Sequence, residues 1–177
     1  MRIVVTGAFG FIGSHFTKYV FNLDEDIKLL VIDNCTYASN KSNLNGVTYE
    51  HLHRDICDIT AEDLGEYDYL VNFAAESHVD NSIKDGRPFV RTNVEGTFNL
   101  LEVARQNPNL KKFIQISTDE VYGDMDDLGS GVLADEKFSI IGSSYYSSTK
   151  ASADLLVQAA GRTYGLPYLI TRTCNNY

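Results

Sequence analysis

Short apolar runs alternate along this chain with longer segments in which apolar residues recur at helical spacing. The short runs predict strands at residues 2–6, 29–32, 47–52, 69–73, 113–116 and 166–171. The longer segments predict helices at 11–21, 89–106 and 144–164. Because apolar strands that alternate with helices pack into a parallel sheet, we predict an α/β fold with a doubly wound sheet of about six strands and helices on both faces.

A glycine-rich turn joins the first predicted strand to the first predicted helix. Its G-x-x-G-x-x-G motif contains Gly7, Gly10 and Gly13. Glycines here permit a tight turn and let backbone N–H groups approach a pyrophosphate at the helix N-terminus. Asp33 follows the second strand, 20 residues after Gly13, which is the spacing of a carboxylate that binds an adenosine ribose. These features predict a Rossmann-type site for NAD, since Asp33 would repel the 2′-phosphate of NADP and no Arg adjoins it.

Further residues are placed to border this cofactor site. The segment 34–45, rich in Asn, Ser and Lys, predicts a loop or broken helix at the cofactor edge. Asp55 and Ile56 are candidates to flank the adenine, although a helix-capping role explains Asp55 equally well. The small residues Ala74 and Ala75 follow the fourth strand and would let the backbone approach the cofactor closely.

The strand at residues 113–116 ends in three side chains that handle protons or hydrogen bonds, Thr118, Asp119 and Glu120. Ligands of open parallel sheets bind beyond the carboxyl ends of the strands, so these two carboxylates are placed for chemistry. Different neighbours could push their pKa values apart and give one acid and one base. Taken alone, the pair is explained equally well as a solvated exit from the strand.

Tyr146 and Lys150 are four residues apart on the last predicted helix and therefore share one face. An ammonium beside a phenol favours the phenolate, so we expect Lys150 to lower the pKa of Tyr146 from about 10. The polar segment 124–142, just before this helix, has a length typical of lids and binding loops. His78 has no second His or Cys at ligand spacing, so we predict no metal site.

Composition and charge narrow the class of protein. The chain has 177 residues, which is enough for one domain. Its net charge of −9 argues against binding nucleic acid. The three cysteines are scattered, and an odd number suits a reducing cytosol. No apolar run approaches the ~20 residues that span a bilayer, and the chain starts directly on a strand without a signal peptide. We expect a cytoplasmic protein without a membrane partner.

Together these motifs resemble the extended short-chain dehydrogenase/reductase superfamily, and within it the nucleoside-diphosphate-glucose 4,6-dehydratases, most of all the dTDP-glucose enzymes. The resemblance covers nearly the whole chain. Its motifs are TGAFGFIGSH (6–15), TYASN (36–40), AAESHVD (74–80), STDEVYG (117–123), YSSTK (146–150) and NNY (175–177). The runs ESHVD and TDE are the more specific ones, because sugar epimerases of the same fold usually lack the Asp-Glu pair.

The resemblance implies an NAD-dependent lyase that converts dTDP-glucose to the 4-keto-6-deoxy sugar with tightly bound NAD. Tyr146, assisted by Lys150, would remove the 4-hydroxyl proton as hydride passes from C4 to NAD, and Thr118 would hydrogen-bond the same oxygen. Glu120 would then take the C5 proton while protonated Asp119 helps the 6-hydroxyl leave as water. Hydride would finally return to C6.

The resemblance also implies sites of contact. The cofactor would be held by Gly7, Gly10, Phe11, Ile12, Gly13, Asp33, Asn34, Thr36, Asp55, Ile56, Ala74, Ala75, Thr92, Tyr146, Lys150 and Asn176. The nucleotide-sugar substrate would be held by Ser77, Thr118 and Asn175. A homodimer is implied through the helices at 89–106 and 144–164.

Departures from the family pattern limit what it implies. Asn81 stands where these enzymes commonly have Arg, and Cys35-Thr36 and Ser39 vary the usual loop. These differences leave the nucleotide, dTDP or UDP, open. Family members continue for well over a hundred further residues, so residues 1–177 correspond to the NAD-binding domain with the catalytic residues, and the C-terminal substrate-binding domain is not present. A nucleotide-sugar epimerase or decarboxylase on the same scaffold, and a non-catalytic NAD-binding domain, are the alternatives.

Overall fold

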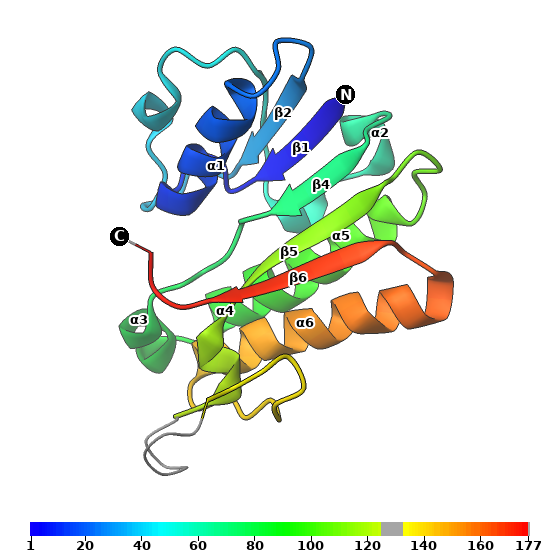
Figure 1. Cartoon of the computed structure of the whole chain (residues 1–177). Helices are drawn as coiled ribbons and strands as arrows, with labels where there is room; N and C mark the ends of the chain where they lie inside the picture. The colour runs from blue at the N-terminus through cyan, green and yellow to red at the C-terminus, as the bar shows by residue number, and fades with distance from the viewer. Residues whose placement is uncertain (125–132, 177) are drawn as a thin grey trace.

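The computed structural model describes residues 1–124 and 133–176, and within them six parallel strands form one sheet in the order β3-β2-β1-β4-β5-β6 (Figure 1). This is the strand order of a Rossmann fold, so the predicted doubly wound sheet is confirmed. The strands are β1 (Arg2–Thr6), β2 (Lys28–Asp33), β3 (Glu50–His53), β4 (Tyr69–Asn72), β5 (Lys112–Thr118) and β6 (Tyr168–Thr173).

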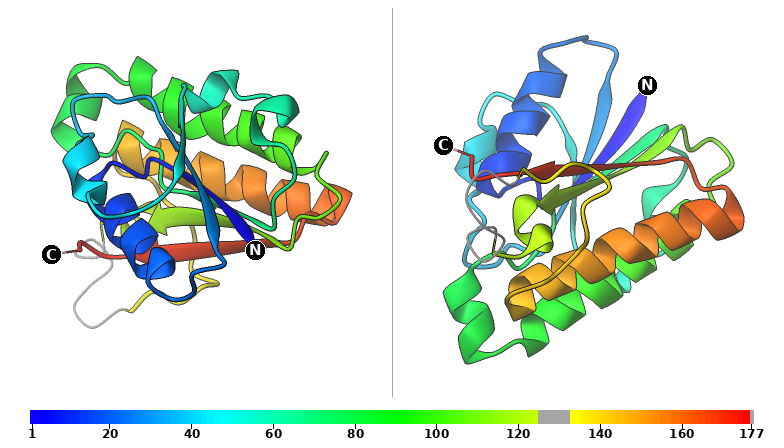
Figure 2. Two further views of the ribbon diagram at one scale, coloured as in Figure 1. Left: turned by 90° about the horizontal axis from the view of Figure 1, so that it is seen from above. Right: turned by 60° about the horizontal axis from the view of Figure 1, so that its bottom comes forward.

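Helices cover both faces of the sheet. In Figure 2, α1 (Phe11–Phe21) lies on one face, and α5 (Thr97–Ala104) and α6 (Tyr145–Tyr164) lie side by side on the other. The shorter elements are η1 (Lys41–Leu44), η2 (Ile56–Asp58), α2 (Ala61–Leu64), α3 (Val79–Lys84), α4 (Arg87–Phe89), the π-helical η3 (Val90–Gly96) and η4 (Asp119–Tyr122). None of the described helices is long and apolar enough to cross a membrane.

Two apolar cores hold the layers together, because successive side chains of a strand point to opposite faces. Val4 and Leu30 are paired across β1 and β2 and pack in the core beneath α5 and α6. The neighbouring pair, Val5 and Val31, packs on the opposite face with Val20 of α1. The parallel register therefore places side chains that point to the same face next to each other on neighbouring strands. It also brings the carboxyl ends of the strands to one edge of the sheet.

Three predicted elements differ from the observed ones. The third strand begins at Glu50 rather than at 47, because a turn after η1, with Gly46 at φ +85°, occupies the preceding residues. The last strand begins at Tyr168, since Pro167 has no N–H to give the ladder. The single helix predicted at 89–106 is divided into α4, η3 and α5 by a widened π turn.

The β6 edge of the sheet is covered on one face only. The edge strand β6 pairs with β5 and, among the described residues, has no strand on its other side. Ile170 packs in the core beneath α6, whereas Leu169, which points to the opposite face, is 49% exposed. The side of the sheet that carries α1 is therefore left open over β6.

Candidate active site

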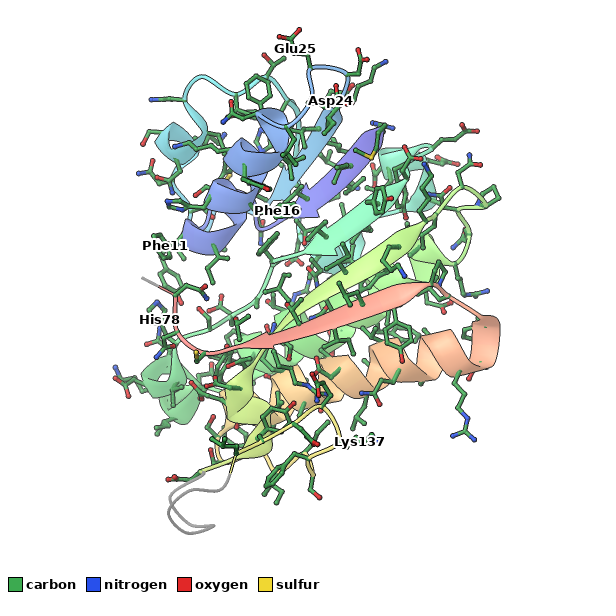
Figure 3. The ribbon with its side chains drawn as sticks, in the orientation of Figure 1. Phe11, Phe16, Asp24, Glu25, His78 and Lys137 are labelled. Atoms are coloured by element: carbon green, nitrogen blue, oxygen red, sulfur yellow. The ribbon has the colours of Figure 1, made fainter. Side chains whose placement is uncertain are left out.

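A groove of about 540 Å³ runs along the carboxyl ends of the central strands. Figure 3 shows Phe11 of α1 and His78 near each other at this end of the sheet, and both residues line the groove. It is lined by Gly7, Gly10, Phe11, Ile12, Gly13, Ile32, Asp33, Asn34, Thr36, Ala38, Ser39, Arg54, Asp55, Ile56, Phe73, Ala74, Ala75, Glu76, Ser77, His78, Thr92, Ile116, Ser117, Tyr146 and Lys150. Every residue that the sequence assigned to the cofactor is in this set except Asn176.

The glycine turn gives the groove a site for an anion. Gly7 has φ +64°, and a Cβ at this position would lie 2.6 Å from the backbone nitrogen of Ala74. Only a glycine lets the turn pack against the segment after β4. No side chain caps the N-terminus of α1 at Gly10, and Phe11 and Ile12 of its first turn border the groove. Uncapped N–H groups at a helix N-terminus form a binding site for phosphate.

Asp33 shapes the turn as well as bordering the groove. Its Oδ2 accepts a hydrogen bond from the backbone N–H of Phe9 at 2.9 Å, and its Oδ1 accepts from the N–H of Cys35 at 2.8 Å and from the Ser39 hydroxyl at 2.6 Å. A carboxylate has about four acceptor positions, so one remains for a ribose hydroxyl. Sequence spacing identified Asp33 but did not reveal its bond to Phe9.

The groove also contains Asp55, for which the sequence left two roles open. Asp55 caps η2 by accepting from the N–H of Cys57 at 2.9 Å, and it also borders the groove. The two roles are therefore compatible. Arg54 borders the groove too, which the sequence analysis missed, but its guanidinium lies 3.5 Å from the carboxylate of Asp63. A second basic side chain lies directly at Asp55, because the guanidinium of Arg91 is 3.6 Å from the Asp55 carboxylate.

Thr118, Asp119 and Glu120 form a compact turn where β5 ends. The Thr118 hydroxyl accepts from the N–H of Glu120 at 3.2 Å and so caps η4, and it lies 3.2 Å from Asp119 Oδ1 as a donor. Burial and the charge of Asp119 raise the pKa of Glu120. A carboxylate with a raised pKa is a stronger base, as proton abstraction from carbon requires.

Tyr146 and Lys150 lie on the buried face of α6 and both line the groove. Contrary to the expectation from their spacing, the pKa of Tyr146 is raised: burial disfavours the phenolate, Glu120 and Asp119 oppose it, and only a hydrogen bond with Thr118 lowers the pKa. Lys150 is not among the groups that shift this pKa, and its ammonium donates to the carbonyl of Ile116 at 2.6 Å. Burial lowers the pKa of Lys150 to about 8.

Asn93 organises the site from the π-helical segment and was missed by the sequence analysis. Its side chain donates to the Glu76 carbonyl and to the Thr149 hydroxyl, each at 3.0 Å, and accepts from the Glu76 N–H at 2.9 Å. The buried amide therefore ties the segment after β4 to α6. An Asn on the apolar side of the predicted helix was the sequence feature that could have identified this residue.

Some predicted residues lie away from the groove. Asn175 and Asn176 are exposed, and the Asn176 amide bonds the carbonyl of Cys174. Thr118, Asp119 and Glu120 adjoin the groove through Ser117 without lining it, whereas Ser77 lines it. Residues 125–132 of the predicted lid-length segment are outside the described residues.

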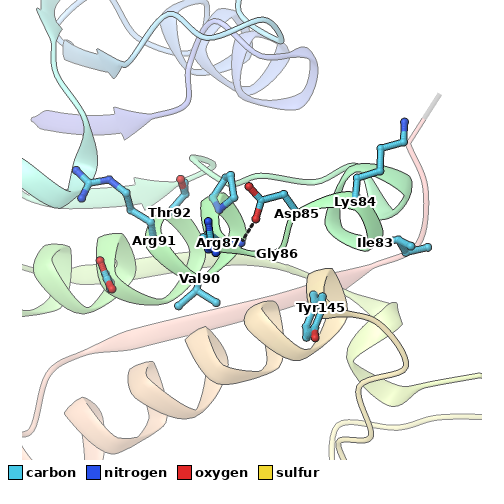
Figure 4. A pocket seen from close by; sticks show the side chains of 11 residues that line it. Ile83, Lys84, Asp85, Gly86, Arg87, Val90, Arg91, Thr92 and Tyr145 are labelled. Carbon is cyan, nitrogen blue, oxygen red and sulfur yellow. Dashed lines mark hydrogen bonds between the residues drawn. The ribbon is translucent and has the colours of Figure 1, made fainter.

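A second, more open hollow of about 1170 Å³ lies between α3, α4, η3 and the start of α6 (Figure 4). Its side chains include Lys84, Arg87 and Tyr145, and Asp85 accepts a hydrogen bond from the N–H of Arg87. None of the proposed catalytic side chains lines it. Within residues 1–124 and 133–176 there is also no cluster of three His, Cys, Asp or Glu that could hold a metal ion.

Comparisons with known proteins agree with this arrangement. Residues 3–177 match the NAD dependent epimerase/dehydratase family. The chain is 45% identical to the low-salt glycan biosynthesis protein Agl12 of Haloferax volcanii, and the match covers all of this chain and 57% of that protein. It is 43% identical to the dTDP-glucose 4,6-dehydratase of Haemophilus influenzae, and this match covers all of this chain and 56% of the enzyme. The chain thus spans just over half the length of these relatives.

Among solved structures, the fold resembles DesIV, a dTDP-glucose 4,6-dehydratase from Streptomyces venezuelae with NAD and TYD bound. The TM-score is 0.90 at 40% sequence identity, and the match covers all of this chain and 56% of DesIV.

Proposed function

Because this chain belongs to the NAD dependent epimerase/dehydratase family, we propose that it is the NAD-binding and catalytic part of a nucleotide-sugar 4,6-dehydratase. The reaction would convert dTDP-glucose to dTDP-4-keto-6-deoxyglucose. The observation that carries this proposal is the Asp119–Glu120 pair, which adjoins Tyr146 where β5 meets the groove. Removing water across two sugar carbons requires an acid and a base in addition to the base at the oxidised hydroxyl.

The groove residues fit NAD as the cofactor. The uncapped N-terminus of α1 suits its pyrophosphate, and the remaining acceptor position of Asp33 suits the adenosine ribose. Lys150 and Tyr146 border the end of the groove at β5 and would hold the nicotinamide ribose. Bound NAD supplies the acceptor and later the donor of a hydride, and its cationic nicotinamide ring favours a nearby phenolate.

In the proposed mechanism each side chain handles one proton. Tyr146 takes the proton of the sugar 4-hydroxyl as the C4 hydrogen leaves as hydride, and Thr118 hydrogen-bonds the same oxygen. The resulting 4-keto group acidifies C5, from which Glu120 removes a proton. Asp119, in its protonated form, donates to the 6-hydroxyl so that it leaves as water. The hydride taken from C4 is finally delivered to C6 and a proton returns to C5, which gives the 4-keto-6-deoxy product. The burial that raises the pKa of Glu120 favours its role as the base.

The test is NAD binding and turnover of dTDP-glucose, with UDP-glucose in parallel, by this chain and by any form that continues beyond residue 177. NAD binding together with a 4-keto-6-deoxy product supports the proposal, and the preferred substrate identifies the nucleotide. A product epimerised at C4 would assign an epimerase instead. NAD binding without turnover by every form would leave a non-catalytic binding domain, and absence of NAD binding would overturn the cofactor assignment.

Three further properties are part of the proposal. Residues 1–177 form the cofactor-binding and catalytic domain, and the greater length of the relatives supports a substrate-binding domain outside this chain. A homodimer through α5 and α6 is supported by the exposed apolar side chains of Phe98 and Leu155 on these helices. A cytoplasmic location is supported by the free thiols of all three cysteines.

A further inference from the structure

A buried ion pair lies behind the catalytic helix face and has no part in the mechanism above. The carboxylate of Asp154 on α6 is fully buried, and its Oδ2 accepts from Arg172 Nε on β6 at 2.8 Å. Arg172 also donates to the Tyr122 hydroxyl at 3.0 Å, and its guanidinium stacks 5.2 Å from that ring. A buried pair of this kind is weak evidence for stability, because desolvation opposes the attraction of the charges.

The position of Asp154 points to Lys150. The two residues are four apart on α6, so their side chains share the buried face with Tyr146, a further turn toward the N-terminus. Asp154 Oδ1 has no hydrogen-bond partner among the described residues, and neither has the nearby buried hydroxyl of Ser117. One oxygen of this carboxylate is therefore held by Arg172, and the other lies in the buried interior near the Ser117 hydroxyl.

On the basis of the proposed function, we propose that Asp154 is a positioning residue. Its buried carboxylate, oriented by Arg172, keeps Lys150 charged and holds the Lys150 ammonium on the Ile116 carbonyl. Without this negative charge, the buried ammonium would lose its proton near neutral pH. A neutral Lys150 would no longer supply positive charge to the nicotinamide end of the groove. Asp154 touches neither cofactor nor substrate in this proposal and acts only through Lys150.

The charges around Lys150 are consistent with this role. Burial lowers the pKa of Lys150 to about 8, and Asp154 is the charged group that raises it. Glu120 and Asp119, on η4, act on Tyr146 rather than on Lys150. Arg172 on β6 acts on Asp154, where with Ser117 it opposes the rise in pKa that burial causes. Tyr122 on η4 faces Arg172.

The decisive measurement is the pKa of Lys150 by NMR titration of protein with labelled lysine side chains, with the Lys150 signal assigned by its loss in Lys150→Met. The wild-type value should be about 8. Asp154→Asn should lower it by about one unit or more, the range for loss of a close opposite charge. Glu25→Gln, which removes an exposed acid far from the groove, is the matched control and should leave the pKa unchanged.

A second variant separates the electrostatic role from a structural one. Arg172→Lys changes the packing of the ion pair but keeps a positive charge beside the carboxylate, so the Lys150 pKa should stay at its wild-type value. If Arg172→Lys lowers the Lys150 pKa as much as Asp154→Asn does, or if Asp154→Asn leaves it unchanged, the proposal is wrong. Should Asp154→Asn fail to fold, Arg172→Gln takes its place: without the guanidinium the buried carboxylate takes up a proton more readily, so the Lys150 pKa should fall, and an unchanged value would contradict the proposal.

These titrations need no substrate, so they are independent of whether the chain, or a longer form, is a dehydratase. If turnover is found, the rate of C4 oxidation should change with pH as Lys150 ionises. Asp154→Asn should shift the midpoint of that pH–rate profile by the same amount as it shifts the Lys150 pKa. A uniform loss of rate at every pH would indicate a structural role only and would overturn the proposal.

Discussion

At the scale of single residues, burial governs the ionisation of the groups proposed for chemistry. Lys150 is in a dry environment that lowers its pKa to about 8 from 10.5. The same cause raises the pKa of Tyr146 and that of Glu120. Burial thus disfavours the charged form of all three groups, and the proposed reaction depends on the partners that offset this effect.

The lowered pKa of Lys150 makes a prediction about stability. Between pH 8 and 10.5 the unfolded chain binds more protons at this residue than the folded chain, so stability gains a contribution as the pH rises through this window. The difference in unfolding free energy between wild type and Lys150→Met should therefore shift in favour of wild type from pH 7.5 to about 9.5. Urea denaturation at several pH values measures it, and a constant difference would contradict the lowered pKa.

Glu120→Gln should separate two steps of the proposed reaction. The amide cannot take a proton from C5, whereas Tyr146 can still act at the 4-hydroxyl. Oxidation should remain measurable as NADH formation, while elimination and solvent deuterium uptake at C5 should fall by about 100-fold or more. Tyr146→Phe is the contrasting variant and should abolish the oxidation itself. Normal loss of water by Glu120→Gln would refute the role of Glu120.

Asp33→Ala should weaken both NAD binding and the fold. The substitution leaves the N–H of Phe9 and of Cys35 without their acceptor and removes the group proposed to bind the ribose. We expect a loss of about 1–3 kcal/mol in unfolding free energy and at least a 10-fold weaker Kd for NAD. Ser39→Ala removes a single bond to Asp33 and serves as the control. Unchanged NAD affinity in Asp33→Ala would exclude the ribose assignment.

At the scale of elements, the path of the backbone through turns decides how close the groove walls can come. Gly7 and Gly46 both have positive φ, but only Gly7 packs against another segment. Gly46→Ala should cost about 1 kcal/mol, because a left-handed conformation is strained for alanine and nothing else is near.

Gly7→Ala should cost more than Gly46→Ala and should also weaken NAD binding. Its Cβ would lie 2.6 Å from Ala74 N, so the turn must move away from the segment after β4. Thermal unfolding and NAD titration are measured for both variants. Gly46→Ala reports the backbone strain alone, whereas Gly7→Ala reports the strain together with the displacement of the turn. Equal losses in both variants would mean that the turn tolerates the contact.

The division of the long predicted helix is an element-scale feature that sequence periodicity did not reveal. Its apolar spacing predicted the helix correctly, but a π turn at η3 brings Asn93 to the Glu76 backbone and to Thr149. Both partners lie far along the chain, and a local pattern contains no information about them.

At the scale of the whole molecule, the open face over β6 gives a test of how the chain relates to its longer relatives. Leu169 is 49% exposed here, so Leu169→Thr should change the unfolding free energy by less than about 0.5 kcal/mol. In a longer form whose added residues cover this face, the same change should cost about 2 kcal/mol. Equal small effects in both forms would mean that the face stays exposed.

The sequence by itself determined the sheet with its six strands, the glycine turn, the acid at the end of β2 and the shared helix face of Tyr146 and Lys150. Each of these depends on periodicity or spacing within a short stretch of chain, where backbone geometry alone relates the residues. The tertiary structure decided the raised pKa of Tyr146, the bonds of Asn93 and the pairing of Asp154 with Arg172. These depend on burial and on partners from distant segments, which are brought together only when the layers pack.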